Sequence, residues 1–472
     1  MFKLDAARGA YVRSPAIVRR ALAPLLRLLP TSFIYGRTYR DWRATIARGA
    51  SDDRFAAGFQ LSSLRQLMAK ALAGSPFYAD VFARTFGPDF EAATMTLADF
   101  RKLPIIDKQT LAAAGDAMLA VPKSSMDVAR TSGSNGEPPF SFYLDKDRSV
   151  REIAFVHQVW SRTGYEPDHA KVVMRGFATQ VPSGRSHEWS PALRELRLAV
   201  FPMTRADAAV YLDLIDQRRI RYLYGYPSAI ETFARHLNRL DRRPKLPLLG
   251  ILPISEPLYG HQRRLFDKIF GDTPIAPFYG LSEKTLFAAE LSGQPDIYEF
   301  DPLYGVAELI GDDGAPVTRI GQEGRLIGTG FVSTGMPFIR YDSQDRAKLV
   351  QLPSAQNGQR LRVSGIMPRR KPDFLISHDG DRIVAIDLTP EDPAFFEDIE
   401  GYQFFQSVPG LCVIKYVATP GGCDQKVERI RSELARKAKG KLDFVVQRVE
   451  GLENPGSGKR AYIDQQLDLA DY

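Results

Sequence analysis

The stretch Ile220-Arg-Tyr-Leu-Tyr224 decides the fold class, because this short run of β-branched and aromatic residues leads into a helical stretch that opens at Pro227. The same pairing occurs earlier in the chain, where Lys171-Val-Val-Met174 is predicted to be a strand and Thr204 opens a helical stretch. Strands that alternate with helices are typical of β-α units on one sheet. The sequence therefore predicts a mixed α/β fold.

The segments on both sides of these units follow other patterns. Residues 60–120 are predicted to be mostly helical, because apolar residues recur there at three- and four-residue spacing: Leu61, Leu64, Met68 and Leu72. From about 305 to 350 the helical pattern disappears, and Gly324-Arg-Leu-Ile-Gly-Thr329 is one of several strand-like runs. A small β subdomain is expected in that stretch.

The C-terminal part is predicted to be a separate α+β domain of about 100 residues. Residues 367–382 concentrate prolines and basic residues and mark a break. The strands expected beyond it are 383–388, 411–417 and 444–449. The intervening helix is expected to cover one face of their sheet with Val427, Ile430 and Leu434.

Composition and charge exclude several classes of protein. The 472 residues are 44% hydrophobic and 25% charged, as in ordinary globular proteins and unlike disordered or low-complexity chains. The net charge of +7 is spread along the chain without a long basic block, so no nucleic-acid partner is expected. The two cysteines, Cys412 and Cys423, support neither a disulfide framework nor a cysteine zinc site, and a cytoplasmic location is expected.

The N-terminal stretch 16–30 is basic and amphipathic. Arg19, Arg20 and Arg27 interrupt any signal-peptide core, and no stretch of the chain reaches the roughly 18 uncharged apolar residues of a membrane span. Two interpretations stay open: a helix packed on the main body, which we favour, and peripheral contact with a membrane.

The segment Thr131-Ser-Gly-Ser-Asn-Gly-Glu-Pro138 carries the most chemical information. Its two glycines, Gly133 and Gly136, let backbone N–H groups turn inward, and the hydroxyls of Thr131, Ser132 and Ser134 add donors. An ordinary flexible turn would explain the glycines but not the hydroxyls. The segment is not a Walker A loop, and we predict that it binds a phosphate chain.

This loop resembles the phosphate-binding signature of the adenylate-forming superfamily, and three further motifs follow in the order of that superfamily. Tyr279-Gly-Leu-Ser-Glu283 is similar to the Tyr-Gly-x-Thr/Ser-Glu motif, and Pro337-Phe-Ile-Arg-Tyr-Asp-Ser-Gln-Asp345 to the Pro-x-Ile-Arg-Tyr-x-x-x-Asp motif. Gly458-Lys459 resembles the motif of the catalytic lysine. The resemblance covers nearly the whole chain.

Other segments narrow the resemblance to the phenylacetate–coenzyme A ligase family. Three features are similar to that family: Ser75-Pro-Phe-Tyr78, Leu103-Pro-Ile-Ile-Asp-Lys108 and the Arg340-Tyr341 pair. Residues 132–143 look most like its capsular-polysaccharide-associated members. The resemblance implies a large N-terminal adenylation domain of several subdomains, residues 1–368, and a hinge at 369–382. A small mobile C-terminal domain, residues 383–472, would carry Lys459.

The resemblance also implies a role for each motif residue. The loop would hold the β- and γ-phosphates of ATP; Glu283 would bind Mg²⁺ and support catalysis, and Ser282 would contact the α-phosphate. Tyr279 would stack on adenine, Gly280 would belong to the same nucleotide-binding site, and Asp345 would bind the ribose hydroxyls. A solvated turn carboxylate remains the alternative for Asp345.

The resemblance also implies that Lys459 and Arg370, both in the C-terminal part, act during the reaction. Some residues depart from the family pattern. Lys459 would bridge the carboxylate and the α-phosphate, while Arg370 would approach the nucleotide from the hinge. Arg369 stands where a glycine is expected, so a solvated basic linker is an alternative for Arg370. Glu137 replaces the lysine that commonly follows the loop, which would repel phosphates if it pointed inward.

The sequence says less about the acid pocket and about bound metal ions. Tyr224-Gly-Tyr-Pro-Ser228 and Leu252-Pro-Ile-Ser-Glu-Pro257 resemble segments that flank the acid pocket, although their aromatic residues could equally be core. Residues 288–308, where some relatives carry a zinc cluster, contain no cysteine or histidine, so no zinc is expected. The six histidines show no metal-ligand spacing and are expected to be structural.

The function predicted from this resemblance is ATP-dependent adenylation of a carboxylic acid, followed by acyl transfer to coenzyme A, in polysaccharide assembly. An amine acceptor that would give an amide is the near alternative. A catalytically inactive nucleotide-binding scaffold and a sugar-phosphate nucleotidyltransferase are hypotheses from other classes. The sequence identifies neither the acid nor the oligomeric state.

Overall fold

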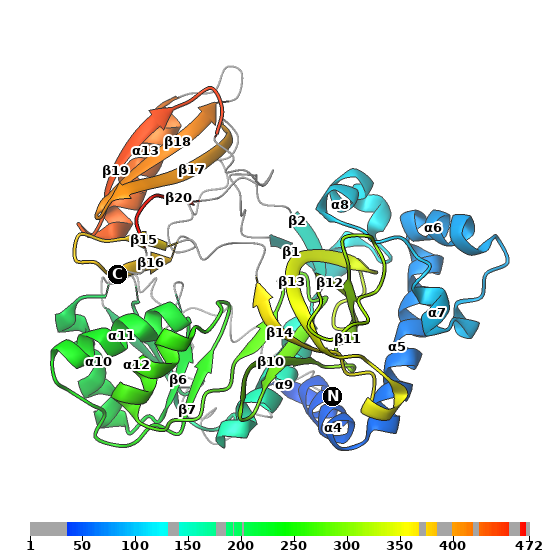
Figure 1. Cartoon of the computed structure of the whole chain (residues 1–472), viewed down its shortest axis with the longest axis horizontal. Helices are drawn as coiled ribbons and strands as arrows, with labels where there is room; N and C mark the ends of the chain where they lie inside the picture. The colour runs from blue at the N-terminus through cyan, green and yellow to red at the C-terminus, as the bar shows by residue number, and fades with distance from the viewer. Residues whose placement is uncertain are drawn as a thin grey trace.

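The computed structural model describes residues 35–130, 141–175, 186–191, 193–200, 203–367, 374–384, 399–418, 424–452 and 463–468. Figure 1 shows two large lobes, with α10–α12 in one and α4–α8 flanking the other, and a smaller C-terminal part above α11. The fold is mixed α/β, as the sequence predicts. The N-terminal stretch 16–30 lies outside the described residues, among which no helix has the length and apolarity to cross a membrane.

The N-terminal helices follow the predicted apolar spacing. Asp52 caps the longest of them through a hydrogen bond from the N–H of Phe55, and Leu64 and Met68 are fully buried on its inner face. The helices are α4 (Gly36–Ser51), α5 (Asp53–Gly74), α6 (Pro76–Phe86), α7 (Leu97–Phe100) and α8 (Lys108–Ala114).

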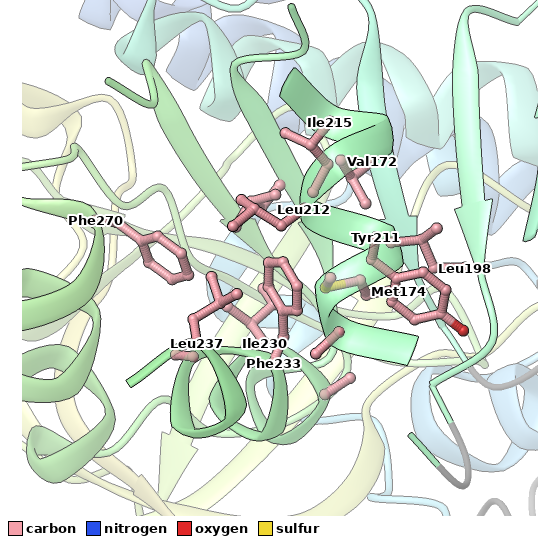
Figure 2. Packing of buried hydrophobic residues seen from close by; sticks show 14 of the residues in the cluster. Val172, Met174, Leu198, Tyr211, Leu212, Ile215, Ile230, Phe233, Leu237 and Phe270 are labelled. Carbon is pink, nitrogen blue, oxygen red and sulfur yellow. The ribbon is translucent and has the colours of Figure 1, made fainter. Parts of the chain in front are cut away.

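A five-stranded sheet forms the centre of the first lobe, in the order β4-β5-β3-β6-β7. Its pairs are parallel except β4 with β5. Helices α10, α11 and α12 pack on one face, where the side chains of Figure 2 interlock, and α9 covers the other. The elements are α9 (Arg148–Trp160), β3 (Lys171–Met174), β4 (His187–Ser190), β5 (Glu195–Leu198), α10 (Arg205–Arg218), β6 (Tyr222–Gly225), α11 (Pro227–Arg239), β7 (Gly250–Pro253) and α12 (Gly260–Phe270).

The elements that decide the fold class lie close to their predicted positions. Strand β3 has the predicted bounds, and Thr204 caps α10 through a reciprocal pair of hydrogen bonds with Asp207. Strand β6 begins at Tyr222 instead of Ile220. The reason is that Arg219 adopts a left-handed conformation and the N–H of Ile220 still bonds to Ile215, so the end of α10 extends into the expected strand.

A seven-stranded antiparallel sheet forms the second lobe, in the order β11-β12-β13-β14-β10-β9-β8. It begins well before residue 305, because the strands from 278 to 300 pair with it. Gln60 of α5 donates a hydrogen bond to the carbonyl of Gly305 and holds the helical layer against this sheet. The strands are β8 (Phe278–Gly280), β9 (Phe287–Leu291), β10 (Gln294–Phe300), β11 (Gly305–Ile310), β12 (Glu323–Gly330), β13 (Tyr341–Gln351) and β14 (Arg362–Met367). A separate pair, β1 (Met126–Arg130) and β2 (Ser141–Asp145), brackets the predicted phosphate loop.

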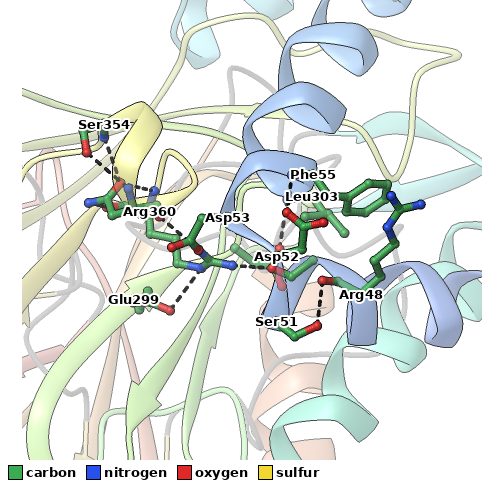
Figure 3. A network of polar contacts seen from close by, with 12 residues as sticks. Arg48, Ser51, Asp52, Asp53, Phe55, Glu299, Leu303, Ser354 and Arg360 are labelled. Atoms are coloured by element: carbon green, nitrogen blue, oxygen red, sulfur yellow. Dashed lines mark hydrogen bonds and ion pairs between the residues drawn. The ribbon is translucent and has the colours of Figure 1, made fainter.

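Arg360 joins the helical layer to the same sheet (Figure 3). It forms ion pairs with Asp53 at the start of α5 and with Glu299 of β10, and it donates to the carbonyl of Gly49. One guanidinium therefore ties α4, α5 and the sheet together, although Arg360 lies 307 residues from Asp53 and 311 residues from Gly49 in sequence.

Arg340, within the predicted nucleotide motif, is a buried structural anchor. Its guanidinium makes two hydrogen bonds, of 2.9 and 3.0 Å, with the carboxylate of Glu308. It also donates to the carbonyls of Arg101 and Leu103, so it connects the helical layer to β11. Both charged side chains are less than a tenth exposed.

The C-terminal part has the predicted α+β composition. Its sheet has the order β19-β18-β17-β20, and Ile430 and Leu434 of the helix are buried against it as predicted. The side chain of Val427, the third residue predicted on that face, lies outside those that the structure describes. Asp381 lies between the parts: it pairs with Lys441 at 2.7 Å and lies 3.7 Å from Arg239 of α11. The elements are β15 (Phe374–Ile376), β16 (Arg382–Val384), β17 (Ile399–Val408), β18 (Leu411–Ala418), α13 (Asp424–Ala438), β19 (Asp443–Arg448) and β20 (Ile463–Gln465).

Asp301, which follows β10, gives a prediction for the pH dependence of stability. Burial raises the pKa of its carboxyl from 3.8 to about 6. The folded chain then holds this proton more tightly than the unfolded chain does. The contribution of the protonated Asp301 to the free energy of unfolding is therefore complete below about pH 4 and is lost as pH rises through about 6. Asp301→Asn is expected to raise the melting temperature at pH 8 by about 2–4 °C. In melting curves from pH 5 to 8, an advantage of the variant that did not grow with pH would contradict this.

Candidate active site

A cavity of about 790 Å³ lies where the two large sheets meet. One side of its wall comes from the seven-stranded sheet and its turns: Tyr279, Gly280, Ser282, Tyr298 and Asp345. The other side comes from α9 and from the ends of the parallel strands: Ile153, Val156, Arg175, Tyr224 and Ile254. Segments from 35 to 367 thus contribute to a single cavity.

Tyr279 and Asp345, from two predicted motifs, are in direct contact. The hydroxyl of Tyr279 donates a hydrogen bond of 2.6 Å to the carboxylate of Asp345, and the N–H of Asp345 donates to the hydroxyl of Ser343. Burial, reinforced by the Asp345 charge, holds the pKa of Tyr279 well above its usual value, so Tyr279 stays a neutral donor. The pair presents a fixed carboxylate at the cavity wall.

Glu283 occupies the turn between β8 and β9. Its neighbours Ser282 and Lys284 line the cavity, and its own carboxylate accepts a hydrogen bond of 3.1 Å from the hydroxyl of Tyr341. Lys284 has a positive φ of 59° and pairs with Glu152 of α9 at 2.6 Å. The turn is therefore held from both sides of the cavity.

The two segments predicted to flank the acid pocket meet at the start of α11. The N–H and the hydroxyl of Ser228 each donate a hydrogen bond of 3.0 Å to the carboxylate of Glu256. A carboxylate is favourable there because the helix N-terminus carries partial positive charge. Of the aromatic residues, Tyr224 lines the cavity while Tyr226 belongs to the core beneath it, so pocket and core roles both occur.

Several predicted site residues cannot be placed, because they lie outside the described residues. These are Thr131, Ser132, Gly133, Ser134, Gly136, Arg370 and Lys459. Glu137 lies outside them too. Their roles stay predictions.

Four charged cavity residues were missed by the sequence analysis: Glu152, Arg175, Lys284 and Asp296. Arg175 directly follows the predicted strand 171–174, and ligands of open α/β sheets bind at the carboxyl ends of parallel strands. That position was a usable signal. Glu152 and Lys284 had none, because their pairing joins segments 132 residues apart.

The buried histidines His157 and His236 make contacts within the protein. His157 is buried, bonds to the hydroxyl of Tyr39, and has a pKa held well below its usual value by burial; His236 bonds to the carbonyl of Met203. Both contacts are structural. Within the ranges that the structure describes, no three histidine, cysteine, aspartate or glutamate side chains form a cluster able to hold a metal ion.

Known proteins resemble this chain in sequence and in fold. No family model matches the chain. A phenylacetate–coenzyme A ligase of Aromatoleum evansii is 26% identical over 338 residues, which cover 69% of this chain and 73% of that protein. One from Pseudomonas putida is 26% identical over 326 residues, covering 67% and 71%. A solved 2-hydroxyisobutyryl-CoA ligase in the postadenylation state matches with a TM-score of 0.51 at 17% identity, covering 89% of this chain and 90% of the other.

The structural match shows that the chain has the fold of adenylate-forming ligases. In sequence, the chain is similar to two phenylacetate–coenzyme A ligases over about two thirds of its length. This likeness supports the resemblance that the motifs predict. The narrower resemblance to capsular-polysaccharide-associated members stays a prediction.

Proposed function

We propose that this chain is an AMP-forming acid–thiol ligase that adenylates a carboxylic acid with ATP and then transfers the acyl group to coenzyme A. The observation that carries the proposal is the shared cavity. It brings Tyr279, Ser282 and Asp345 of the nucleotide motifs opposite the predicted acid-pocket residue Tyr224. The names of the two relatives support the same activity.

The reaction consists of two displacements. In the first, a carboxylate oxygen bonds to the α-phosphorus of ATP, the bond to the bridging oxygen breaks, and pyrophosphate leaves. In the second, the coenzyme A sulfur bonds to the acyl carbon and AMP leaves with the electron pair. Both steps need fixed charges and dipoles around phosphoryl oxygens.

The described residues would share the binding of the nucleotide. Asp345, held by Tyr279, offers carboxyl oxygens that can accept hydrogen bonds from the ribose hydroxyls. Glu283 would hold Mg²⁺, which usually takes one or two carboxylates and completes its shell with phosphate oxygens and waters, so a lone carboxylate fits. Bound Mg²⁺ would neutralise the charge of the departing pyrophosphate.

Three parts of the proposal rest on the sequence. These are the phosphate loop from Thr131 to Gly136, the catalytic Lys459, and rotation of a C-terminal lid about a hinge at 369–382. A cytoplasmic location and a role in polysaccharide assembly are proposed on the same basis.

The test is ATP–pyrophosphate exchange with a panel of aryl, fatty, hydroxy and amino acids. Exchange that depends on one class of acid, followed by thioester formation with coenzyme A, is expected. Acyl-adenylate without thioester, but with amide formation from an added amine, would replace coenzyme A as the acceptor. ATP binding without exchange for any acid would favour the scaffold, and exchange that needs a sugar phosphate would favour a nucleotidyltransferase.

Asp345→Asn is expected to weaken ATP binding without abolishing it. The substitution keeps the shape but removes the charge that receives the ribose hydroxyls, and a hydrogen bond to a charged group contributes about 1.5–3 kcal/mol. The KM for ATP should rise roughly 10- to 100-fold, with the KM for the acid nearly unchanged. Asp312→Asn, on the exposed turn after β11, is the control. An unchanged KM for ATP in Asp345→Asn would place the ribose elsewhere.

A further inference from the structure

Arg175 occupies a position in the sheet that favours contact with a ligand. It directly follows β3, at the carboxyl end of the central parallel strands, and it lines the cavity. Strand β3 lies between β5 and β6, and the chain crosses from β5 to β6 through α10. Open α/β sheets bind ligands at the carboxyl ends of strands where the order reverses in this way.

Arg175 has no counterion among the described residues. Its guanidinium donates a hydrogen bond of 2.7 Å to the hydroxyl of Tyr224 and contacts the hydroxyl of Tyr226. In contrast, the partly buried Arg263 and the buried Arg340 are each paired with a carboxylate. A charge removed from water is normally paired, so an unmatched guanidinium at a cavity wall suits an anionic ligand.

The other cationic side chain on the described wall is already matched. Lys284 pairs with Glu152 at 2.6 Å. The carboxylates of Glu256 and Asp345 accept hydrogen bonds from Ser228 and Tyr279, and the carboxylate of Asp296 accepts one from the N–H of Gly365. Arg175 is therefore the cation of the described cavity wall that remains for an anion of the ligand.

The place of Arg175 indicates which part of a ligand it would meet. The predicted nucleotide residues come from the seven-stranded sheet. Arg175 follows β3 of the five-stranded sheet, where β3 is two strands away from β7. At the usual strand spacing, β3 and β7 are about 10 Å apart. The apolar side chains of Ile153 and Val156 on α9 line the same cavity. An acid whose reacting carboxylate lies at the nucleotide would place its apolar part against this wall and its other end near Arg175.

We propose that the acid substrate carries a second oxyanion, remote from the carboxylate that is adenylated, and that Arg175 binds this second group. The inference rests on the proposed function and adds the class of substrate to it. The tyrosine hydroxyls hold the guanidinium in place, and its remaining donors suit the two oxygens of a carboxylate or those of a phosphonate.

The test compares matched acids in the ATP–pyrophosphate exchange assay with the full chain. The pairs are hexanoate with adipate, benzoate with terephthalate, and phenylacetate with its 4-carboxy and 4-phosphono derivatives. The wild type should have at least about a tenfold higher kcat/KM for the dianionic member of a pair. Arg175→Gln should lower that value about 10- to 100-fold, leaving the monoanionic acid and the KM for ATP unchanged. The 4-carboxy and 4-phosphono arms show which oxyanion is preferred.

The control is Arg194→Gln, at the opposite, amino end of the same sheet, where Arg194 is paired with Asp168. This variant should behave as wild type. An equal loss on both members of a pair, or a raised KM for ATP, would overturn the proposal, because Arg175 would then act on the reacting carboxylate or the nucleotide. Wild-type preference for monoanionic acids throughout would also overturn it.

Calorimetry separates this inference from the proposed function. Titrating the dianionic acids into protein with α,β-methylene-ATP measures binding without turnover. Binding to the wild type that is lost in Arg175→Gln, with no exchange for any acid, would refute the ligase activity and keep the oxyanion site. Exchange with no selective effect of Arg175→Gln would keep the ligase activity and refute the oxyanion site.

Discussion

Lys459→Ala is expected to lower the rate of acyl-adenylate formation by several powers of ten, on the order of 10³, while ATP binding stays nearly intact. The side chain would act only when charge develops between the carboxylate and the α-phosphate, so its loss should appear in kcat. Lys459 lies in Asn454-Pro-Gly-Ser-Gly-Lys459, a glycine-rich segment suited to carrying an ammonium into a closing site. Pyrophosphate release in single-turnover experiments and nucleotide titration measure the two quantities separately.

The control for Lys459→Ala is Arg429→Ala, which removes an exposed cation from α13 in the same C-terminal part. It should leave both measurements unchanged. Pyrophosphate release at the wild-type rate in Lys459→Ala would remove Lys459 from the mechanism. Loss of nucleotide binding in that variant would instead give Lys459 a ground-state role.

Arg340→Ala is expected to destabilise the fold by about 3–5 kcal/mol, because it leaves the buried carboxylate of Glu308 without its counterion. The carbonyls of Arg101 and Leu103 would lose donors as well. Urea denaturation followed by circular dichroism measures the change, and the yield of soluble protein should fall with it.

Two variants make the Arg340 prediction specific. Arg346→Ala, on β13 shortly after Arg340, breaks ion pairs with Asp312 and Glu323 whose side chains are each a third or more exposed. It should cost no more than about 1 kcal/mol. The double variant Arg340→Met with Glu308→Leu removes both charges and should recover much of the lost stability. Equal costs for Arg340→Ala and Arg346→Ala would show that the buried pair is not the anchor.

Local sequence signals predicted the parallel sheet well and the antiparallel sheet less well. Strand β3 and the cap of α10 by Thr204 each depend on a few adjacent residues, so their patterns are visible in the sequence. The extent of the seven-stranded sheet depends on β10 pairing with β14, more than 60 residues later. Such pairing is set by tertiary contacts that residue propensities do not carry.

The candidate site was predictable where a motif supplied the residue and not where a contact did. Tyr279, Ser282 and Asp345 were chosen by resemblance, and the structure places all three at one cavity. The pairing of Lys284 with Glu152 and the role of Arg340 as an anchor result from packing between distant segments. Arg340 belongs to a nucleotide motif, yet its described contacts are internal to the protein.

The division of the cavity between two sheets has a consequence for the divergence of such enzymes. The predicted nucleotide residues lie on the antiparallel sheet and its turns, while Arg175 and Tyr224 lie at the ends of β3 and β6. Asp345 is held by Tyr279 and Ser343, both from the antiparallel sheet, so a substitution of Arg175 need not disturb it. Tyr224 is more constrained, because it packs in a cluster that the two sheets share. Relatives can therefore acquire new acids by drift at a few strand ends while their use of ATP is inherited unchanged.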